Sequence, residues 1–293
     1  MNALLIVNPG SGQGKAAREK RKLLDLVSNM PHIHPELTEN SEQVTNLARD
    51  AAVKGYDRVI VAGGDGTINN VINGLNDTSI PLGIIPLGTA NVLAYELGIP
   101  PNDIENALDI IHKDKIQDID LGIANGRRFL LMAGLGFDAE VVDLVSPKVK
   151  DILGTVAYAP PVLQQLICYN PVKFRLTFEN NSTYETDAFA VIISNCGCYA
   201  KSFRLAPQAI FDDGLLDILI FESSPGAKLK LIGQTLECFF QQRILDSNAT
   251  YFKATQIRIE SNPPVKMQLD GDVYGKSNVD IKILPKALRL IVP

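Results

Sequence analysis

Residues 58–71 are Arg58-Val59-Ile60-Val61-Ala62-Gly63-Gly64-Asp65-Gly66-Thr67-Ile68-Asn69-Asn70-Val71, an apolar run that leads into three glycines around one carboxylate. The pattern predicts a buried β-strand that turns directly into a helix starting near Thr67. Glycine lacks a Cβ, so this turn can approach a ligand closely, and the helix start directs free N–H groups at an anion. We therefore expect a phosphate-binding turn in which Asp65 holds a Mg²⁺-bound water or a proton, with a simple helix cap as the alternative.

Two similar loops follow other apolar runs. Asn8-Pro9-Gly10-Ser11-Gly12-Gln13-Gly14-Lys15 follows Ala3 to Val7, and Pro86-Leu87-Gly88-Thr89-Ala90-Asn91 follows the run from Leu82. The first loop is not a Walker A loop, because Pro9 and Ala16 occupy its glycine and hydroxyl positions, and Lys15 replaces the third glycine of a dinucleotide fingerprint. Three helix starts at one sheet edge suit several phosphates in line, as in ATP. A plain strand-to-helix turn is the alternative for each loop taken singly.

Length and composition favour a two-domain protein of the cytoplasm. The chain has 293 residues, of which 46% are hydrophobic and 21% charged, more than a single core usually holds. Its net charge of −5 argues against a general nucleic-acid binder. The apolar start is too short for a membrane span or a signal peptide. The four cysteines, Cys168, Cys196, Cys198 and Cys238, lack zinc-site spacing and are expected to be reduced thiols.

The periodicity of the chain changes near residue 120. Before it, strand-like runs alternate with helical patterns at Lys15 to Asn29, Ser41 to Gly55 and Asp103 to Lys113, which predicts an α/β fold with a doubly wound sheet. The ligand of such a sheet lies beyond the carboxyl ends of the strands. After it, hairpin patterns such as Asn125-Gly126 and a series of strands dominate. We expect two domains, residues 1–120 and 121–293.

Four segments together resemble the diacylglycerol/sphingosine lipid kinase family. They are Asn8-Pro9-x-Ser11-Gly12, Gly63-Gly64-Asp65-Gly66-Thr67-x-Asn69, Gly88-Thr89-x-Asn91 and Asp212-Asp213-Gly214-Leu215-Leu216-Asp217. The resemblance spans nearly the whole chain, although NAD kinases and phosphofructokinases also carry a Gly-Gly-Asp-Gly loop. It implies an N-terminal nucleotide-binding domain, a C-terminal β-sandwich lipid-substrate domain, ATP in the cleft between them, and γ-phosphoryl transfer to a lipid hydroxyl. It also implies that the last strand, Ala287 to Val292, returns to the first domain.

The resemblance assigns roles by position. The residues implied at the ATP site are Asn8, Pro9, Gly10, Ser11, Gly12, Thr38, Gly63, Gly64, Asp65, Gly66, Thr67, Ile68, Asn69 and Thr89, with Asp65 close to the phosphates and the catalytic Mg²⁺. Asp270-Gly271-Asp272 is similar to the family's Asp-Gly-Glu triplet, in which the third residue accepts the proton of the lipid hydroxyl. Because Asp272 is one methylene shorter than glutamate, either Asp270 or Asp272 is a candidate base. A plain hairpin turn is the alternative.

The acidic segment Asp212 to Asp217 resembles a second, structural Mg²⁺ site of bacterial family members. There a carboxylate is joined by backbone carbonyls, which by position are Asp213 with Ile210 and Leu215. A solvated acidic turn is the alternative. The chain departs from many diacylglycerol kinases at Val92, where they have aspartate. This departure leaves the acceptor open between diacylglycerol, which would give phosphatidic acid, and a sphingoid-type or other lipid.

A lipid acceptor implies work at a membrane surface, because moving an acyl chain into water costs about 0.8 kcal/mol per CH₂. Lys15, Arg18, Lys20, Arg21 and Lys22 form a basic stretch that would meet anionic headgroups, with a solvated helix face as the alternative. Two rival functions remain, an NAD-kinase-like nucleotide kinase and a non-catalytic nucleotide- or lipid-binding regulator. The sequence leaves open a homodimer as a further partner.

Overall fold

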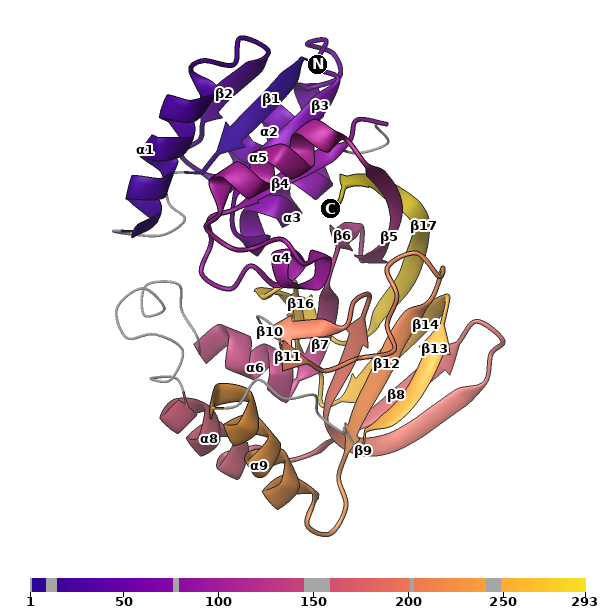
Figure 1. The fold of residues 1–293 in the computed structure, drawn as a ribbon. Helices are drawn as coiled ribbons and strands as arrows, with labels where there is room; N and C mark the ends of the chain where they lie inside the picture. The colour runs from indigo at the N-terminus through magenta and orange to yellow at the C-terminus, as the bar shows by residue number, and fades with distance from the viewer. Residues whose placement is uncertain (1, 9–14, 76–78, 145–158, 201–202, 241–248) are drawn as a thin grey trace. The chain divides into compact units, whose positions relative to one another are not determined.

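The computed structural model describes residues 2–8, 15–75, 79–144, 159–200, 203–240 and 249–293 (Figure 1). The chain divides into two compact units. Unit 1 comprises Met1–Leu121 with Pro285–Pro293, and unit 2 comprises Gly122–Leu284. Within the described residues, no helix has both the length and the apolar character needed to cross a bilayer.

Unit 1 contains a parallel sheet made from the predicted apolar runs. Its strands are β1 (Ala3–Val7), β2 (Ile33–Leu37), β3 (Arg58–Gly63) and β4 (Leu82–Pro86), in the order β4-β3-β1-β2. Every residue of β1 and β4 is buried, as is β3 from Val59 onward. Strands buried on both faces need continuous apolar sequence, which is what these runs provide.

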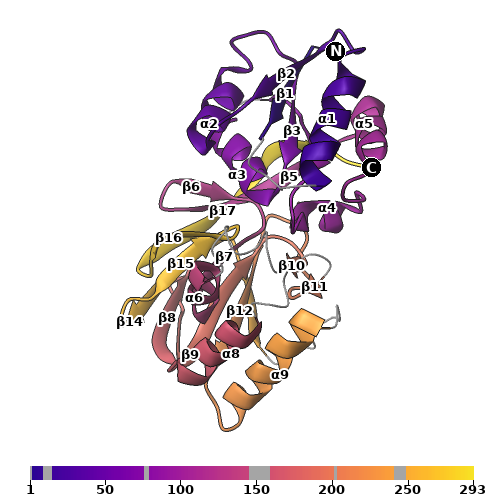
Figure 2. The ribbon, with the colours of Figure 1, turned by 90° about the vertical axis from the view of Figure 1, so that its left-hand side faces the viewer.

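The helices described in this unit are α1 (Lys15–Val27), α2 (Ser41–Asp50), α3 (Asp65–Gly74), α4 (Val92–Leu97) and α5 (Ile104–Lys113). Figure 2 shows α2 and α3 on one face of the strands and α1 and α5 on the other, which is the doubly wound arrangement expected. Asn40 caps α2 by accepting the N–H of Gln43, and Ser41 is the first helical residue. Asp103 caps α5 through the N–H of Asn106.

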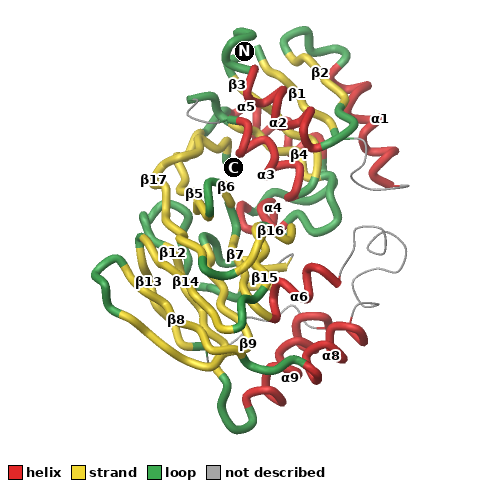
Figure 3. The backbone as a smooth tube through the Cα atoms, turned by 180° about the vertical axis from the view of Figure 1, so that it is seen from behind, coloured by secondary structure: helices red, strands yellow, loops and turns green. Residues whose placement is uncertain are grey.

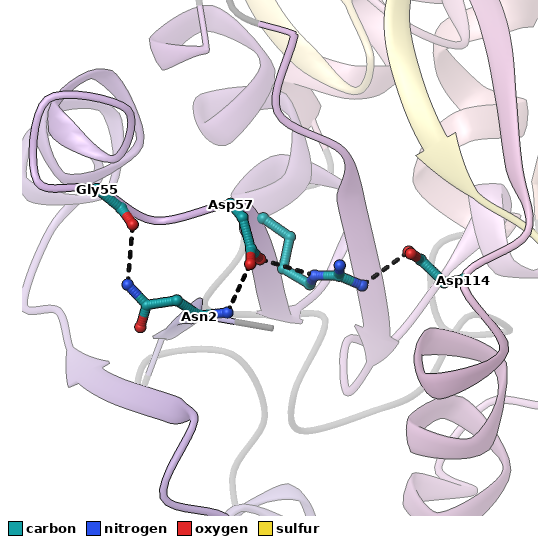
Figure 4. A network of polar contacts seen from close by, with 5 residues as sticks. Asn2, Gly55, Asp57 and Asp114 are labelled. Atoms are coloured by element: carbon teal, nitrogen blue, oxygen red, sulfur yellow. Dashed lines mark hydrogen bonds and ion pairs between the residues drawn. The ribbon is translucent and has the colours of Figure 1, made fainter.

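The amino ends of β1 and β3 are tied together by a polar network (Figure 4). Asp57 accepts the backbone N–H of Asn2 at 2.8 Å, and Asn2 Nδ2 donates to the carbonyl of Gly55 at 2.9 Å. Arg58 bridges Asp57 and Asp114 at 3.0 and 2.7 Å. Burial raises the pKa of Asp57, but the bonds from Arg58 and Asn2 outweigh it, so the pKa lies below its usual value. This end of the sheet is opposite the glycine loops, so the network serves stability.

Unit 2 is an antiparallel β structure. The Asn125-Gly126 turn joins β5 (Ile116–Ala124) to β6 (Arg127–Phe129), with φ values of 48° and 84°. The main order is β16-β15-β7-β9-β8-β14-β17, and β12 pairs with β9 and β13. The strands are β7 (Met132–Gly136), β8 (Val172–Phe178), β9 (Thr183–Ser194), β12 (Leu216–Glu222), β13 (Thr250–Ala254), β14 (Gln256–Asn262), β15 (Lys266–Leu269), β16 (Asp272–Lys276) and β17 (Val279–Ile291), with a separate pair β10 (Cys198–Ala200) and β11 (Phe203–Arg204).

The core of unit 2 follows the two-residue period of its strands. Phe174 and Leu176 of β8 are buried beside Ile257 and Ile259 of β14, and the residues between them face outward. Among the described residues of this unit, the helices are α6 (Phe137–Leu144), α8 (Ala159–Cys168) and α9 (Ala227–Phe240). Figure 3 shows α8 and α9 side by side. The result is the β-sandwich domain expected from the sequence.

Strand β17 serves both units. Its first half pairs with β14, where Ile257 lies opposite Ile281. Its last residues belong to unit 1, where Leu290 pairs with Leu82 of β4 and the Val292 N–H donates to the carbonyl of Lys115 at 2.9 Å. The final residues of the chain therefore complete the sheet of the first unit.

Candidate active site

Two of the predicted glycine loops meet at the carboxyl edge of the unit 1 sheet. Gly63 ends β3, Gly64 is the extended N-cap of α3, and α3 begins at Asp65, two residues earlier than expected. A Cβ on Gly88 would lie 2.4 Å from the Cα of Gly64. No side chain fits at that distance, so the approach of the two loops requires glycine.

Asp65 connects these loops through its carboxylate. Its oxygens accept the N–H groups of Val92 at 3.0 Å and Leu93 at 3.2 Å, at the start of α4. The aspartate therefore caps a helix, as the alternative proposed, but the helix is α4 and not its own α3, which has no side-chain cap. Val92 contributes its backbone N–H, and not its side chain, to this contact.

Asn91 shapes the second loop and is a residue that the sequence reasoning did not single out for a role. Its side chain accepts the N–H of Gly88 at 2.9 Å and donates to the Gly88 carbonyl at 2.7 Å. Its φ of 50° lies in the left-handed region, which asparagine tolerates better than most residues. The Gly-x-x-Asn spacing was the sign of this role in the sequence, because an asparagine amide can hydrogen-bond to the backbone of its own turn.

Other predicted ATP-site residues gather at the end of β1. Asn8 Nδ2 donates to Thr67 Oγ1 at 3.0 Å, and the Thr38 hydroxyl donates to the carbonyl of Val7 at 3.3 Å. Thr38 and Asn69 are buried, whereas Thr89 is exposed. Ile68 packs into the core, so only its backbone is available to a ligand. Pro9, Gly10, Ser11 and Gly12 lie outside the described residues.

The Asp270-Gly271 pair forms the two-residue turn between β15 and β16, with φ values of 48° and 86°. The Asp270 carboxylate accepts three backbone N–H groups, those of Leu130, Leu131 and Met132, at 2.7, 2.8 and 2.9 Å. The hairpin turn proposed as the alternative is therefore present, and three hydrogen bonds hold its first residue in place. Asn195, which the sequence reasoning missed, holds the other side of this segment by donating to the Leu130 carbonyl at 2.9 Å.

Asp272 differs from Asp270 in its surroundings. It is the first residue of β16 and is exposed. Among the residues that the structure describes, its carboxylate has no hydrogen-bond or ion-pair partner. An exposed carboxylate therefore follows directly after a turn whose first residue is held by three hydrogen bonds.

The predicted structural Mg²⁺ site contains a lysine. Asp213 accepts the Leu215 N–H at 3.0 Å, and its other oxygen lies 2.9 Å from Lys253 Nζ. Lys253 also lies 3.6 Å from Asp217, whose pKa burial raises to about 6, with Lys253 opposing the rise. Ile210 is exposed. No cluster of three acidic, histidine or cysteine ligands is found among the described residues. A Mg²⁺ here would have to share Asp213 with the lysine ammonium, and this metal site stays a prediction.

The basic stretch on α1 is smaller than expected. Lys20 is buried on the face that carries Leu23 and Val27, and burial lowers its pKa. Lys22 pairs with Glu105 at 2.6 Å. Lys20 lies three residues before Leu23 and seven before Val27, and this helical spacing was the sign in the sequence that Lys20 faces inward.

Comparisons with known proteins match both units of the chain to protein families. A family model described as the diacylglycerol kinase catalytic domain matches residues 2–124, and one described as the YegS C-terminal NAD kinase beta sandwich-like domain matches residues 132–292. A diacylglycerol kinase of Staphylococcus aureus is 31% identical over 99% of this chain and 92% of that protein. A diacylglycerol kinase of Bacillus subtilis is 28% identical over 99% and 96%.

Solved structures give the same result. The crystal structure of a diacylglycerol kinase from Bacillus anthracis superposes with a TM-score of 0.79 at 27% identity, covering 100% of this chain and 97% of that one. Yeast NADH kinase complexed with NADH superposes with a TM-score of 0.54 at 12% identity, covering 100% and 84%. The latter likeness is one of fold alone.

Proposed function

Because the chain belongs to the diacylglycerol kinase family and is a lipid kinase, we propose that it transfers the γ-phosphoryl group of ATP to the hydroxyl of diacylglycerol. The hydroxyl oxygen bonds to the γ-phosphorus, the bond from that phosphorus to the bridging oxygen breaks, and ADP leaves. The products are phosphatidic acid and ADP. The observation that carries the mechanism is the exposed Asp272 carboxylate on a turn that Asp270 fixes.

The nucleotide is assigned to the carboxyl edge of the unit 1 sheet. There the close approach of Gly64 and Gly88 leaves the loop backbones bare of side chains. The start of α3 directs its dipole to the same edge. Asn8 and Thr67, joined by a 3.0 Å hydrogen bond, add polar side chains beside the loop. Bare backbone, a helix start and neutral polar groups suit phosphates better than an apolar ligand.

The described residues fit a hard cation beside the phosphates. Asp65 is a partly exposed carboxylate whose orientation is fixed by the N–H groups of Val92 and Leu93. Hard cations prefer carboxylate and water oxygens, so Asp65 is the residue that would hold Mg²⁺. When bound, Mg²⁺ would neutralise charge on the phosphoryl oxygens.

Asp272 is the better candidate for the base. An alcohol is a weak nucleophile, so a carboxylate must accept its proton as the phosphorus bond forms. Asp270 already accepts three backbone N–H groups, which occupy most of its lone pairs. Asp272 keeps its oxygens toward solvent. In this assignment Asp270 fixes the turn and Asp272 takes the proton.

The names of two relatives, both called diacylglycerol kinases, support diacylglycerol as the acceptor. A sphingoid base or another lipid is the second candidate, because the sequence departs from many diacylglycerol kinases at Val92. We place the enzyme at a membrane surface, because long acyl chains leave a bilayer only at a cost of about 0.8 kcal/mol per CH₂. Arg18 and Arg21 on α1 are available to anionic headgroups.

The test is phosphoryl transfer from γ-labelled ATP in mixed vesicles. Separate reactions contain diacylglycerol, a sphingoid base, NAD or no acceptor. We expect labelled phosphatidic acid, and we expect Asp65→Ala and Asp272→Asn to lose nearly all transfer while keeping the wild-type circular dichroism spectrum. Label on the sphingoid base alone would reassign the acceptor, and label on NAD alone would reassign the enzyme class. Tight ATP binding without lipid-dependent transfer would indicate a regulator.

A further inference from the structure

Unit 2 contains a buried polar chain that ends at the candidate catalytic turn. Asp138, in the first turn of α6, and Gln268 of β15 are both buried. Asp138 accepts hydrogen bonds from the Tyr199 hydroxyl and, at 2.9 Å, from Gln268 Nε2. Gln268 Oε1 in turn accepts the N–H of Gly271 at 2.8 Å. The chain thus runs from Tyr199 through Asp138 and Gln268 to the middle residue of the turn.

We infer that Asp138 and Gln268 are positioning residues, which hold the Asp270-Gly271-Asp272 turn in the geometry that phosphoryl transfer needs. The inference rests on the proposed function. A glutamine amide has a donor end and an acceptor end, and the two are easily exchanged by a flip. An ionised Asp138 is a hydrogen-bond acceptor and not a donor. It therefore selects the orientation in which Gln268 Nε2 faces Asp138 and Gln268 Oε1 faces Gly271.

The space for this chain is made by a glycine. Gly134 of β7 lies opposite Gln268 in the strand pairing. A Cβ on Gly134 would lie 1.6 Å from Asp138 Oδ2 and 2.8 Å from Gln268 Nε2. Any side chain at this position would therefore displace the Asp138–Gln268 bond.

A buried carboxylate needs a reason, because apolar surroundings penalise its charge. Burial raises the pKa of Asp138, and the bonds from Tyr199 and Gln268 act against this rise. The effect specific to Asp138 is that it fixes the orientation of the Gln268 amide. Gln268 Oε1 is thereby held as the acceptor for the Gly271 N–H.

Gly271 is the position where such a hold has most effect on Asp272. Its φ of 86° places it in the left-handed region, and it is the residue directly before Asp272. Asp270 fixes the first residue of the turn from the Leu130–Met132 segment, and Gln268 fixes the second. Between them the backbone leading to the base has two independent restraints.

The test exchanges hydrogen-bond donors for acceptors at positions 138 and 268 while keeping the side chains nearly the same size. In Asp138→Asn, the new amide sets its Nδ2 either against Gln268 Nε2 or, after a flip, against the Tyr199 hydroxyl, so a single orientation of Gln268 is no longer enforced. In Gln268→Glu, two carboxylates meet. In the double variant, the introduced asparagine amide would donate to the introduced glutamate, whose carboxylate would still accept the Gly271 N–H, so every bond is restored. Asp280→Asn, an exposed change on β17, is the matched control.

We expect each single variant to lower kcat about tenfold or more with the KM for ATP within about twofold, and the double variant to recover kcat to within about threefold. In an Asp272→Asn background, Asp138→Asn should lower the residual kcat by less than about twofold, because it acts through Asp272. A full further loss in that background, or no recovery in the double variant, would overturn the inference.

A second readout does not depend on activity. Hydrogen exchange at the Gly271 amide should accelerate at least about tenfold in each single variant and return to the wild-type rate in the double variant. Unchanged exchange in the single variants refutes the positioning role even if the kinase is active. Conversely, the expected exchange pattern in a protein without lipid-dependent transfer would refute the proposed function and leave the hydrogen-bond chain in place.

Discussion

Replacing Asp270 by asparagine tests whether Asp270 and Asp272 have different roles, because the two substitutions should change stability differently. One Asp270 oxygen accepts the N–H groups of Leu131 and Met132, and the other accepts that of Leu130. Asparagine keeps one oxygen and sets an NH₂ group against one of these donors. Losing a hydrogen bond to a charged group costs about 1.5–3 kcal/mol, and asparagine tolerates the positive φ, so little backbone strain is added. We expect Asp270→Asn to lose about 2–3 kcal/mol of stability.

Asp272→Asn is the control for this experiment, since its carboxylate is exposed and its stability should change by less than about 0.5 kcal/mol. Urea unfolding of the full chain gives the two changes, and native-state exchange at the Leu130 and Met132 amides assigns the loss to this segment. Activity should fall in both variants, but stability only in Asp270→Asn. Equal, small stability changes in the two variants would refute the assignment of Asp270 as the fixing residue.

Three further predictions concern other parts of the chain. Gly88→Ala places a Cβ 2.4 Å from the Gly64 Cα, so the KM for ATP should rise about tenfold or more in steady-state kinetics with the secondary structure retained. Asp57 has a lowered pKa, so its contribution is present above the ordinary carboxyl pKa and is lost as pH falls through the folded value; Asp57→Asn should flatten the acid limb of stability against pH, and an unchanged limb would contradict this. Asp217 has a raised pKa of about 6, so stability falls as pH rises from the ordinary carboxyl pKa to that value. Lys253→Met should raise the pKa of Asp217 further and extend this fall to higher pH in urea unfolding, whereas an unchanged or flatter curve would show that Lys253 does not offset the buried charge.

Local patterns predicted much of the fold. The apolar run before Gly63 is a buried strand, and the Asn125-Gly126 and Asp270-Gly271 pairs are turns with positive φ at both residues. These features depend on residues within a few positions of one another, where periodicity and turn chemistry decide the conformation. Boundaries were less accurate, since a helix can begin earlier than expected when its cap is a glycine, as at Gly64.

The partners of the key carboxylates could not be predicted in the same way. Asp65 contacts residues 27 and 28 positions away, and Asp270 contacts residues 138 to 140 positions away. Which backbone N–H groups face a carboxylate across such separations depends on how whole elements pack. The same is true of Lys253, which lies 40 positions from Asp213 and introduces a cation that the acidic segment itself gives no sign of.

The division of β17 between the units sets an order for synthesis. Residues 1–121 leave the ribosome first, but the strand that completes their sheet lies at 285–293, after all of unit 2. The first unit therefore waits, with the β4 edge unpaired, while the second is translated and folds. A nascent chain arrested before residue 285 should bind chaperones through that edge, and the edge can close only once residues 285–293 have been synthesised.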